Sequence, residues 1–182
     1  MALSATIYAC EVTLNDSDRG VYETLEFRVA RHPSETAEYL VTRVLAYCLE
    51  YGEGLEFSSG LSDPDAPALT IRDLTGQLLS WIEIGTPEAA RLHKATKAAA
   101  RVVVYSHKNV APLLARLEAE DVHRRDTIEI YEIDRELVAA LVAGLERRLR
   151  LNIAITDRHL YVSLGERSVD GAITAHRTGA AT

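Results

Sequence analysis

The sequence contains no apolar run that approaches the ~20 residues a helix needs to span a bilayer. The first residues lack a basic segment followed by a long apolar stretch, so no secretory signal is visible. Cysteine is scarce as well: Cys10 and Cys48 cannot form a framework of disulfides, and their apolar neighbours indicate small buried side chains. We therefore expect a cytoplasmic protein with no membrane partner.

Several motifs that carry well-known chemistry are also missing. There is no glycine-rich phosphate-binding loop, no Cys/His spacing that suits zinc and no G-x-S-x-G nucleophile elbow. The six histidines are scattered along the chain, and no two of them stand at a spacing that favours a shared metal. Charged residues are what remains as candidates for a functional site.

Positive charge is in short supply, with 20 Lys and Arg against 27 Asp and Glu and a formal net charge of −7. Nucleic-acid binding depends on Lys and Arg that neutralise phosphates. The balance argues against general coating of nucleic acid but leaves a local basic face open. Nucleic acid and a protein remain candidate partners, and we expect a monomer or a weak oligomer.

What is present suits a globular domain, because 182 residues, 47% of them apolar, can bury a sizeable core. Apolar alternation predicts an N-terminal antiparallel hairpin over residues 5–29, and Pro33 followed by Ser34 predicts a helix that begins at Ser34. Further strands are expected at 69–73, 78–84, 101–105, 127–133, 151–155 and 160–164, and further helices at 87–100, 110–120 and 137–149.

This order predicts one α/β domain over residues 1–182, with a mixed β-sheet flanked by helices and a hairpin at each end. Strands 69–73 and 78–84 should be antiparallel neighbours, because one tight turn joins them. Strand 101–105 should run parallel to 78–84 after a helical crossover. The last few residues are small and polar and are expected to be mobile.

Glu83 is the strongest candidate for a functional carboxylate. It shares a face of its predicted strand with Leu79 and Trp81 and stands between Ile82 and Ile84. A carboxylate in such a setting must find a partner, raise its pKa or bind a cation. The alternative is that Glu83 lies at the end of the strand and faces water.

Asp73 stands across the turn from the strand of Glu83, so adjacent strands could present both carboxylates to one Mg²⁺ ion. Asp at the first position of a turn is equally an ordinary capping residue. Glu35 and Arg43 share a flank of the first helix, which also fits an ordinary helix rim. Lys94 belongs to a cationic helix, and periodicity leaves open whether it faces solvent. That helix carries Arg91, Lys94, Lys97 and Arg101.

Several segments, in order over residues 1–105, resemble the YaeQ family of bacterial proteins. They are Met1-Ala-Leu-Ser-Ala-Thr-Ile-Tyr, Ala30-Arg-His-Pro-Ser-Glu-Thr, Leu55-Glu-Phe, Gly60-Leu-Ser, Asp73-Leu-Thr-Gly, Trp81-Ile-Glu-Ile-Gly and Val102-Val-Val-Tyr. The resemblance implies a variant of the PD-(D/E)XK restriction-endonuclease fold. In that superfamily two acids on neighbouring strands hold Mg²⁺, a lysine helps to activate water, and an acid on the preceding helix often assists.

Carried over to this chain, the resemblance implies that Asp73 and Glu83 bind Mg²⁺ or Mn²⁺, with Glu35 as the helix acid. The usual lysine would stand where this chain has Gly85. The resemblance favours Lys94 as its substitute, and Arg43 would supplement it.

Two hypotheses follow. The first is a metal-dependent nuclease or phosphodiesterase, favoured by the grouping of Glu35, Asp73, Glu83 and Lys94. The second is a catalytically silent nuclease-like domain that binds a protein or a nucleic acid, favoured by the net charge of −7 and by the missing lysine.

Overall fold

The computed structural model describes residues 4–58 and 65–179. Their contacts group into two compact units, residues 1–49 with 133–174 and residues 50–132 with 175–182. Each unit contains a mixed β-sheet with helices, so the predicted α/β class is confirmed at this level. One domain over residues 1–182 stays a prediction. The expected mobility of the chain end falls on residues 180–182, which lie outside the described residues.

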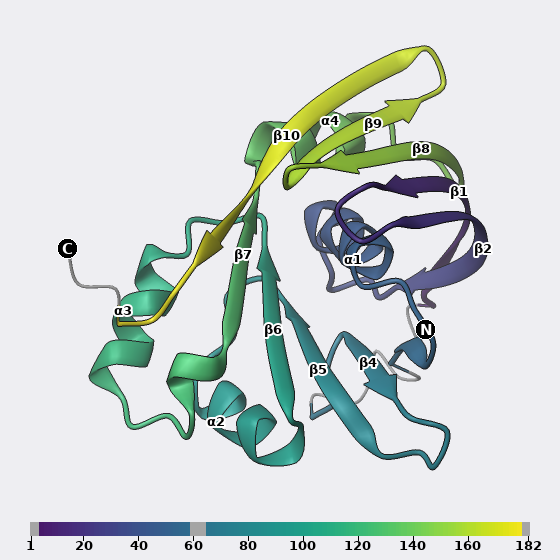
Figure 1. Ribbon diagram of the computed structural model, residues 1–182. Coiled ribbons are helices and arrows are strands. Elements are labelled where there is room, and N and C mark those ends of the chain that lie inside the picture. Colours follow the sequence, from purple (N-terminus) through teal and green to yellow (C-terminus); the bar gives the residue numbers. More distant parts are fainter. Residues whose placement is uncertain (1–3, 59–64, 180–182) are drawn as a thin grey trace. The chain divides into compact units, whose positions relative to one another are not determined.

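The sheet of the first unit has the strand order β2-β1-β8-β9-β10. β1 (Thr6–Asp16) and β2 (Val21–Arg31) form the predicted N-terminal hairpin, and β1 pairs in parallel with β8 (Arg148–Thr156). β9 (His159–Leu164) is antiparallel to both β8 and β10 (Arg167–His176). Figure 1 shows the strands β1, β2 and β8 curving around α1 (Ala37–Leu49).

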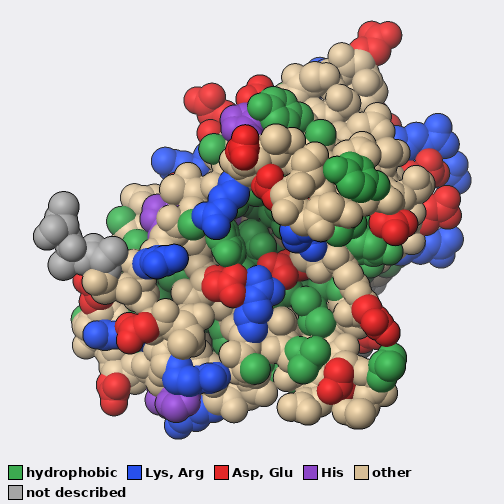
Figure 2. All heavy atoms as spheres, in the orientation of Figure 1, with side chains coloured by type: hydrophobic (Ala, Val, Ile, Leu, Met, Phe, Trp, Pro, Cys, Tyr) green, Lys and Arg blue, Asp and Glu red, His purple; other side chains and the backbone are tan. Residues whose placement is uncertain are grey.

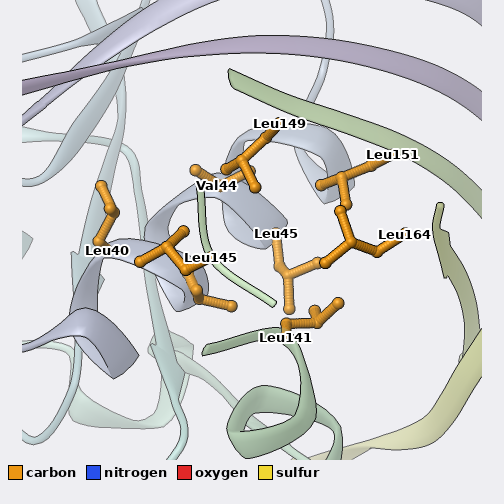
Figure 3. A pocket seen from close by; sticks show the side chains of 9 residues that line it. Leu40, Val44, Leu45, Leu141, Leu145, Leu149, Leu151 and Leu164 are labelled. Carbon is orange, nitrogen blue, oxygen red and sulfur yellow. The ribbon is translucent and has the colours of Figure 1, made fainter. Parts of the chain in front are cut away.

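A pocket lined only by leucine and valine marks the core of this unit. Its walls come from α1, α4 (Arg135–Ala143), the connection after α4, β8 and β9, and their side chains point toward one another (Figure 3). The lining residues are Leu40, Val41, Val44, Leu45, Leu141, Leu145, Leu149, Leu151 and Leu164. The packing of these apolar side chains stabilises the unit. Because none of them is polar, the pocket offers no group for orienting a polar ligand.

Two predicted helix boundaries in this unit are wrong. α1 begins at Ala37, because Thr36 supplies the cap: its Oγ1 accepts a hydrogen bond from the backbone N–H of Tyr39 at 3.1 Å. Ser34 instead contacts the ring of His32 at 2.6 Å. The last helix ends at Ala143, and the residues predicted as its final turn, including Leu149, belong to strand β8. Two-residue alternation and pairing with β1 override the helical spacing there.

β10 was not predicted, because its sequence is polar and small. In the structure Gly171 packs against α4, where a Cβ atom would come within 2.9 Å of Leu137 Cβ. Ile173 is buried, and its backbone N–H donates to the carbonyl of Arg158 at 2.8 Å. The strand therefore forms through a close approach that glycine permits and through pairing with β9.

The sheet of the second unit has the strand order β7-β6-β5-β4-β3. β3 (Leu55–Phe57), β4 (Leu69–Arg72) and β5 (Leu78–Ile84) are antiparallel neighbours, whereas β5, β6 (Arg101–Ser106) and β7 (Glu129–Ile133) run parallel. Both predicted pairings of the strand at 78–84 are thereby confirmed. A 3-10 turn, η1 (Arg125–Thr127), precedes β7.

Two helices cover one face of the parallel strands in this unit. They are α2 (Ala89–Ala98) and α3 (Ala111–Ala119), and both lie close to the predicted ranges. The buried cluster between helices and sheet includes Trp81, Leu92, Val102, Val104, Leu113, Leu117 and Ile130. The face of β5 that carries Trp81 therefore packs on α2 and α3, which places Glu83 beside the same helices. Within the described residues, no helix is long and apolar enough to cross a bilayer.

Candidate active site around Glu83

The register of β4 and β5 separates Asp73 from Glu83. Asp73 lies opposite Gln77 at the turn, where its backbone N–H donates to the carbonyl of Gln77 at 3.0 Å. Leu69 lies opposite Ile82, so Glu83 stands at the other end of the hairpin. At a strand rise of ~3.3 Å per residue, the backbone positions of Asp73 and Glu83 are about 20 Å apart. The predicted sharing of one cation by these two carboxylates does not fit this register.

The carboxylate of Asp73 is occupied by its own turn. Oδ1 accepts hydrogen bonds from the backbone N–H groups of Thr75 and Gln77 at 2.8 and 2.9 Å and from the hydroxyl of Thr75 at 2.6 Å. These bonds, led by that of the Thr75 hydroxyl, hold the pKa of Asp73 below its ordinary value of 3.8. Asp73 is thus placed to order an exposed turn.

Glu83 is buried, with 4% of its surface exposed, near the C-terminal end of a parallel strand. Its Oε1 atom accepts two hydrogen bonds of 2.6 Å, one from Nε1 of Trp81 and one from Nε of Arg91. Within the described residues, no donor contacts Oε2. Two donors of the protein therefore hold Oε1, whereas the described residues supply none to Oε2.

Burial shifts the pKa of this carboxylate. It raises the pKa of Glu83 above its ordinary value of 4.5, although the hydrogen bond from Trp81 and the charge of Arg91 act in the opposite direction. A carboxylate with a raised pKa at the carboxyl end of a parallel strand is a common feature of catalytic sites.

Two cations on α2 hold the chain segment that leads into β4. Nη2 of Arg91 donates to the backbone carbonyl of Ala66 at 2.6 Å, and Nζ of Lys94 donates to Oδ1 of Asp65 at 2.9 Å. Arg91 and Lys94 are three residues apart and so lie on the same side of their helix. The register explains why this segment arrives here, because Ala68 precedes the residue that lies opposite Ile82.

Asp65, rather than Asp73, is therefore the acid that pairs with the cations of α2, one of which, Arg91, contacts Glu83. The hydrogen bond from Lys94, and then the charges of Lys94 and Arg91, lower the pKa of Asp65. The Asp65 and Lys94 side chains remain 76% and 54% exposed, so water and a ligand can reach both. We call Glu83, Arg91, Lys94 and Asp65 the Glu83 cluster.

The sequence pattern indicates Glu83 and Lys94 as candidates but does not indicate Asp65 or the role of Arg91. Asp65 stands in a segment with two prolines and a glycine, which has no periodicity to assign it to a face. One signal was present: a buried carboxylate requires a counter-charge, and the nearest helix carries Arg91 facing the same side as Lys94.

Glu35 and Arg43 belong to the first unit and contact each other. The Arg43 guanidinium reaches both oxygens of Glu35, at 3.4 and 3.2 Å, and also donates to the carbonyl of Ala30 at 2.5 Å. Glu35 in turn accepts a 3.3 Å hydrogen bond from the backbone of His32. These contacts order the entry to α1, and a contribution of the pair to a site at Glu83 stays a prediction.

A separate charged network lies in the second unit and is built on Arg101. Arg101 bridges Glu50 and Glu129, with its closest contacts at 2.6 and 2.7 Å, and the hydroxyls of Tyr105 and Tyr131 donate to these two acids at 2.6 and 3.0 Å. Burial, followed by the charge of Glu50, raises the pKa of Tyr105. Within the described residues this network has no open ligand position comparable to that of Glu83.

The fold and the cluster define an α/β protein with mixed sheets and a buried carboxylate near the C-terminal end of a parallel strand. The chain belongs to the YaeQ family: it matches the family described as "YaeQ protein" over residues 1–173. It is 30% identical, over 176 residues, to the uncharacterized protein YaeQ of Escherichia coli (strain K12) and to that of Salmonella typhi. Both alignments cover 96% of this chain and 97% of the relative.

Solved structures of the same family share the fold. The crystal structure of the YaeQ protein from Pseudomonas syringae has a TM-score of 0.85 and 29% identity, and covers 94% of this chain and 95% of its own. That of the YaeQ protein from Xanthomonas axonopodis pv. citri has a TM-score of 0.82 and 30% identity, with 96% and 99% covered. The resemblance noted over residues 1–105 thus extends along nearly the whole chain.

Proposed function

We propose that the chain is a metal-dependent nuclease or phosphodiesterase, a variant of the PD-(D/E)XK class, whose reactive group is Glu83. The observation that supports this proposal is the asymmetry of its carboxylate. Trp81 and Arg91 fix Oε1, whereas Oε2 has no donor among the described residues. A buried carboxylate oriented in this way is suited to bind one cation or to accept one proton.

The residues present fit the smallest set of protein ligands that a hard divalent cation needs. Mg²⁺ and Mn²⁺ prefer oxygen ligands, and Mg²⁺ is commonly held by one or two carboxylates together with water and substrate phosphate. Glu83 and Asp65 would supply the carboxylates. Within the described residues, no group of three or more His, Cys, Asp or Glu could hold a metal, so substrate and water would complete the shell. When bound, the cation would polarise the phosphoryl group and lower the pKa of water.

The other members of the cluster have separate roles in this proposal. Lys94, with an exposed ammonium on α2, would contact a phosphate oxygen and stabilise the charge that develops on it. Trp81 packs in the buried cluster and shields Glu83 from bulk water, which strengthens electrostatic interactions at Oε2. Asp65 replaces Asp73 as the second acid, and the predicted roles of Glu35 and Arg43 are not part of this proposal.

The alternative is a catalytically silent domain that binds a protein or a nucleic acid. The specific observation in its favour is that each carboxylate of the cluster already has a cation from the chain itself, at 2.6 Å for Glu83 and 2.9 Å for Asp65. On the face shown in Figure 2, basic and acidic side chains are interspersed, an arrangement that does not favour coating by nucleic acid.

Calorimetric titration with MnCl₂ separates the two proposals, together with cleavage of labelled single-stranded DNA, duplex DNA and RNA in Mg²⁺ and Mn²⁺. The wild-type protein should bind Mn²⁺ and cleave at least one substrate, and Glu83→Ala should do neither while keeping its circular dichroism spectrum. No Mn²⁺ binding by the wild type would favour the binding module. Cleavage that is unchanged in Glu83→Ala would assign the activity to another site or to a contaminant.

We also propose a cytoplasmic location for this activity, because Cys10 and Cys48 are both free and buried. Burial raises the pKa of Cys10 to about 12 and that of Cys48 beyond it, so neither thiol is reactive. Free cysteines are typical of reducing compartments.

A further inference from the structure

The guanidinium of Arg91 occupies the position of a cation at Glu83. Its Nε atom lies 2.6 Å from Oε1, and this ion pair is largely buried, with side chains 28% and 5% exposed. A buried carboxylate of this kind must be compensated, and in the absence of a metal Arg91 is the cation that compensates it. A divalent cation that binds Glu83 adds positive charge beside this guanidinium and competes with it for the same carboxylate.

Arg91 has a second anchor that does not involve the carboxylate. Its Nη2 atom donates to the backbone carbonyl of Ala66 at 2.6 Å, one residue after Asp65. A guanidinium that dissociates from Glu83 therefore remains bound to the carbonyl of Ala66, on the same side of the helix as Lys94. Guanidinium groups bind phosphate oxygens through paired N–H donors, so a phosphate placed between Arg91 and Lys94 would replace the lost carboxylate contact.

We propose that Arg91 exchanges partners: it neutralises Glu83 before metal binds and holds a substrate phosphate afterwards. This inference rests on the proposed metal site. Arg91 weakens the binding of a divalent cation alone, because the cation must overcome the ion pair. Arg91 strengthens the binding of a phosphodiester once the cation is present, so cation and substrate bind cooperatively.

The test compares wild type with Arg91→Gln by calorimetric titration of MnCl₂ alone. It is followed by fluorescence anisotropy of a labelled phosphorothioate oligodeoxynucleotide at saturating Mn²⁺. Lys97→Gln is the matched control, because it removes the same charge from the same helix at an exposed position. Arg91→Gln should bind Mn²⁺ about tenfold more tightly and the oligonucleotide about tenfold more weakly. Lys97→Gln should change the affinity for Mn²⁺ by less than about twofold.

A third variant covers the case in which Arg91→Gln does not fold. Arg91→Lys keeps the charge, but a single ammonium cannot repeat both the Nε contact with Glu83 and the Nη2 contact with Ala66. Its Mn²⁺ affinity should lie between those of wild type and Arg91→Gln. If wild type binds Mn²⁺ and the Arg91 variants bind it equally or more weakly, the inference is overturned while the metal site stands. If no protein binds Mn²⁺, the proposed function itself fails.

Discussion

Nε of Arg91 lies 2.6 Å from Oε1 of Glu83, and the same arginine reaches the backbone of Ala66 from its other arm. This relationship fixes which end of the β4–β5 hairpin carries the charged cluster. It also separates the acid of the Glu83 cluster that precedes β4, Asp65, from the acid in the turn, Asp73.

Asp65→Asn should weaken Mn²⁺ binding by at least about tenfold, a loss found even for residues that only support metal ligands. Asp73→Ala should leave the Mn²⁺ affinity unchanged and lower the melting temperature, since the turn loses an acceptor of three hydrogen bonds. Calorimetry and thermal unfolding of both variants check the prediction. The reverse pattern, with Asp73→Ala losing the metal, would restore Asp73 as a ligand.

Glu83→Gln should remove a pH-dependent part of the stability of the metal-free protein. Because burial raises the pKa of Glu83 above 4.5, the folded state favours the protonated carboxyl. The free energy of unfolding of the wild type therefore gains from Glu83 as the pH falls through the raised pKa and loses this gain as the pH rises. Glutamine imitates the protonated form.

Urea denaturation in EDTA between about pH 5 and pH 8 measures this effect. The free energy of unfolding of Glu83→Gln, relative to wild type, should increase with pH. A difference that stays flat or decreases with pH would show that Glu83 is ionised at no electrostatic cost.

Arg101→Met should destabilise the second unit, because it leaves Glu50, which is 8% exposed, and Glu129 without their shared cation. Arg101 is itself 36% exposed, so solvent screens part of the interaction, and the expected cost is about 1–3 kcal/mol, between the values for an exposed and a buried pair. Arg150→Met is the control, since its pair with Glu11 is exposed and should contribute less than about 1 kcal/mol. Chemical denaturation compares the two variants. Equal effects would contradict the structural role of the network.

Gly171→Ala should destabilise the first unit by about 1–3 kcal/mol, the usual range for overpacking. The added Cβ would lie 2.7 Å from Cβ of Asp134 and 2.9 Å from Cβ of Leu137, and neither atom is the end of a flexible side chain. Gly52→Ala is the control, because the nearest atom would be 3.8 Å away. Unchanged stability in Gly171→Ala would mean that β10 does not pack on α4 in solution.

Local pattern was sufficient for most elements of this fold. The hairpin of β1 and β2, the antiparallel pair β4 and β5, and the parallel strand β6 were all predicted close to their observed residues. Alternation, turn residues and short apolar runs are properties of neighbouring residues, so they can be read without knowing the rest of the chain. The pattern failed where contacts between residues far apart in the sequence determine the local structure. Leu149 continued a helical spacing but pairs with β1, and the polar strand β10 forms through Gly171.

The candidate site shows the same division. The sequence by itself determined that Glu83, between Ile82 and Ile84, would be a carboxylate in an apolar setting that needs a counter-charge. It could not identify the partner. A spacing of ten residues suggested Asp73, but antiparallel register places the residue after the first strand at the far end of the second, about 20 Å away. Only the tertiary structure brought Arg91 to Glu83 and Asp65 to Lys94, because the segment before β4 and the helix after β5 meet through packing and not through sequence spacing.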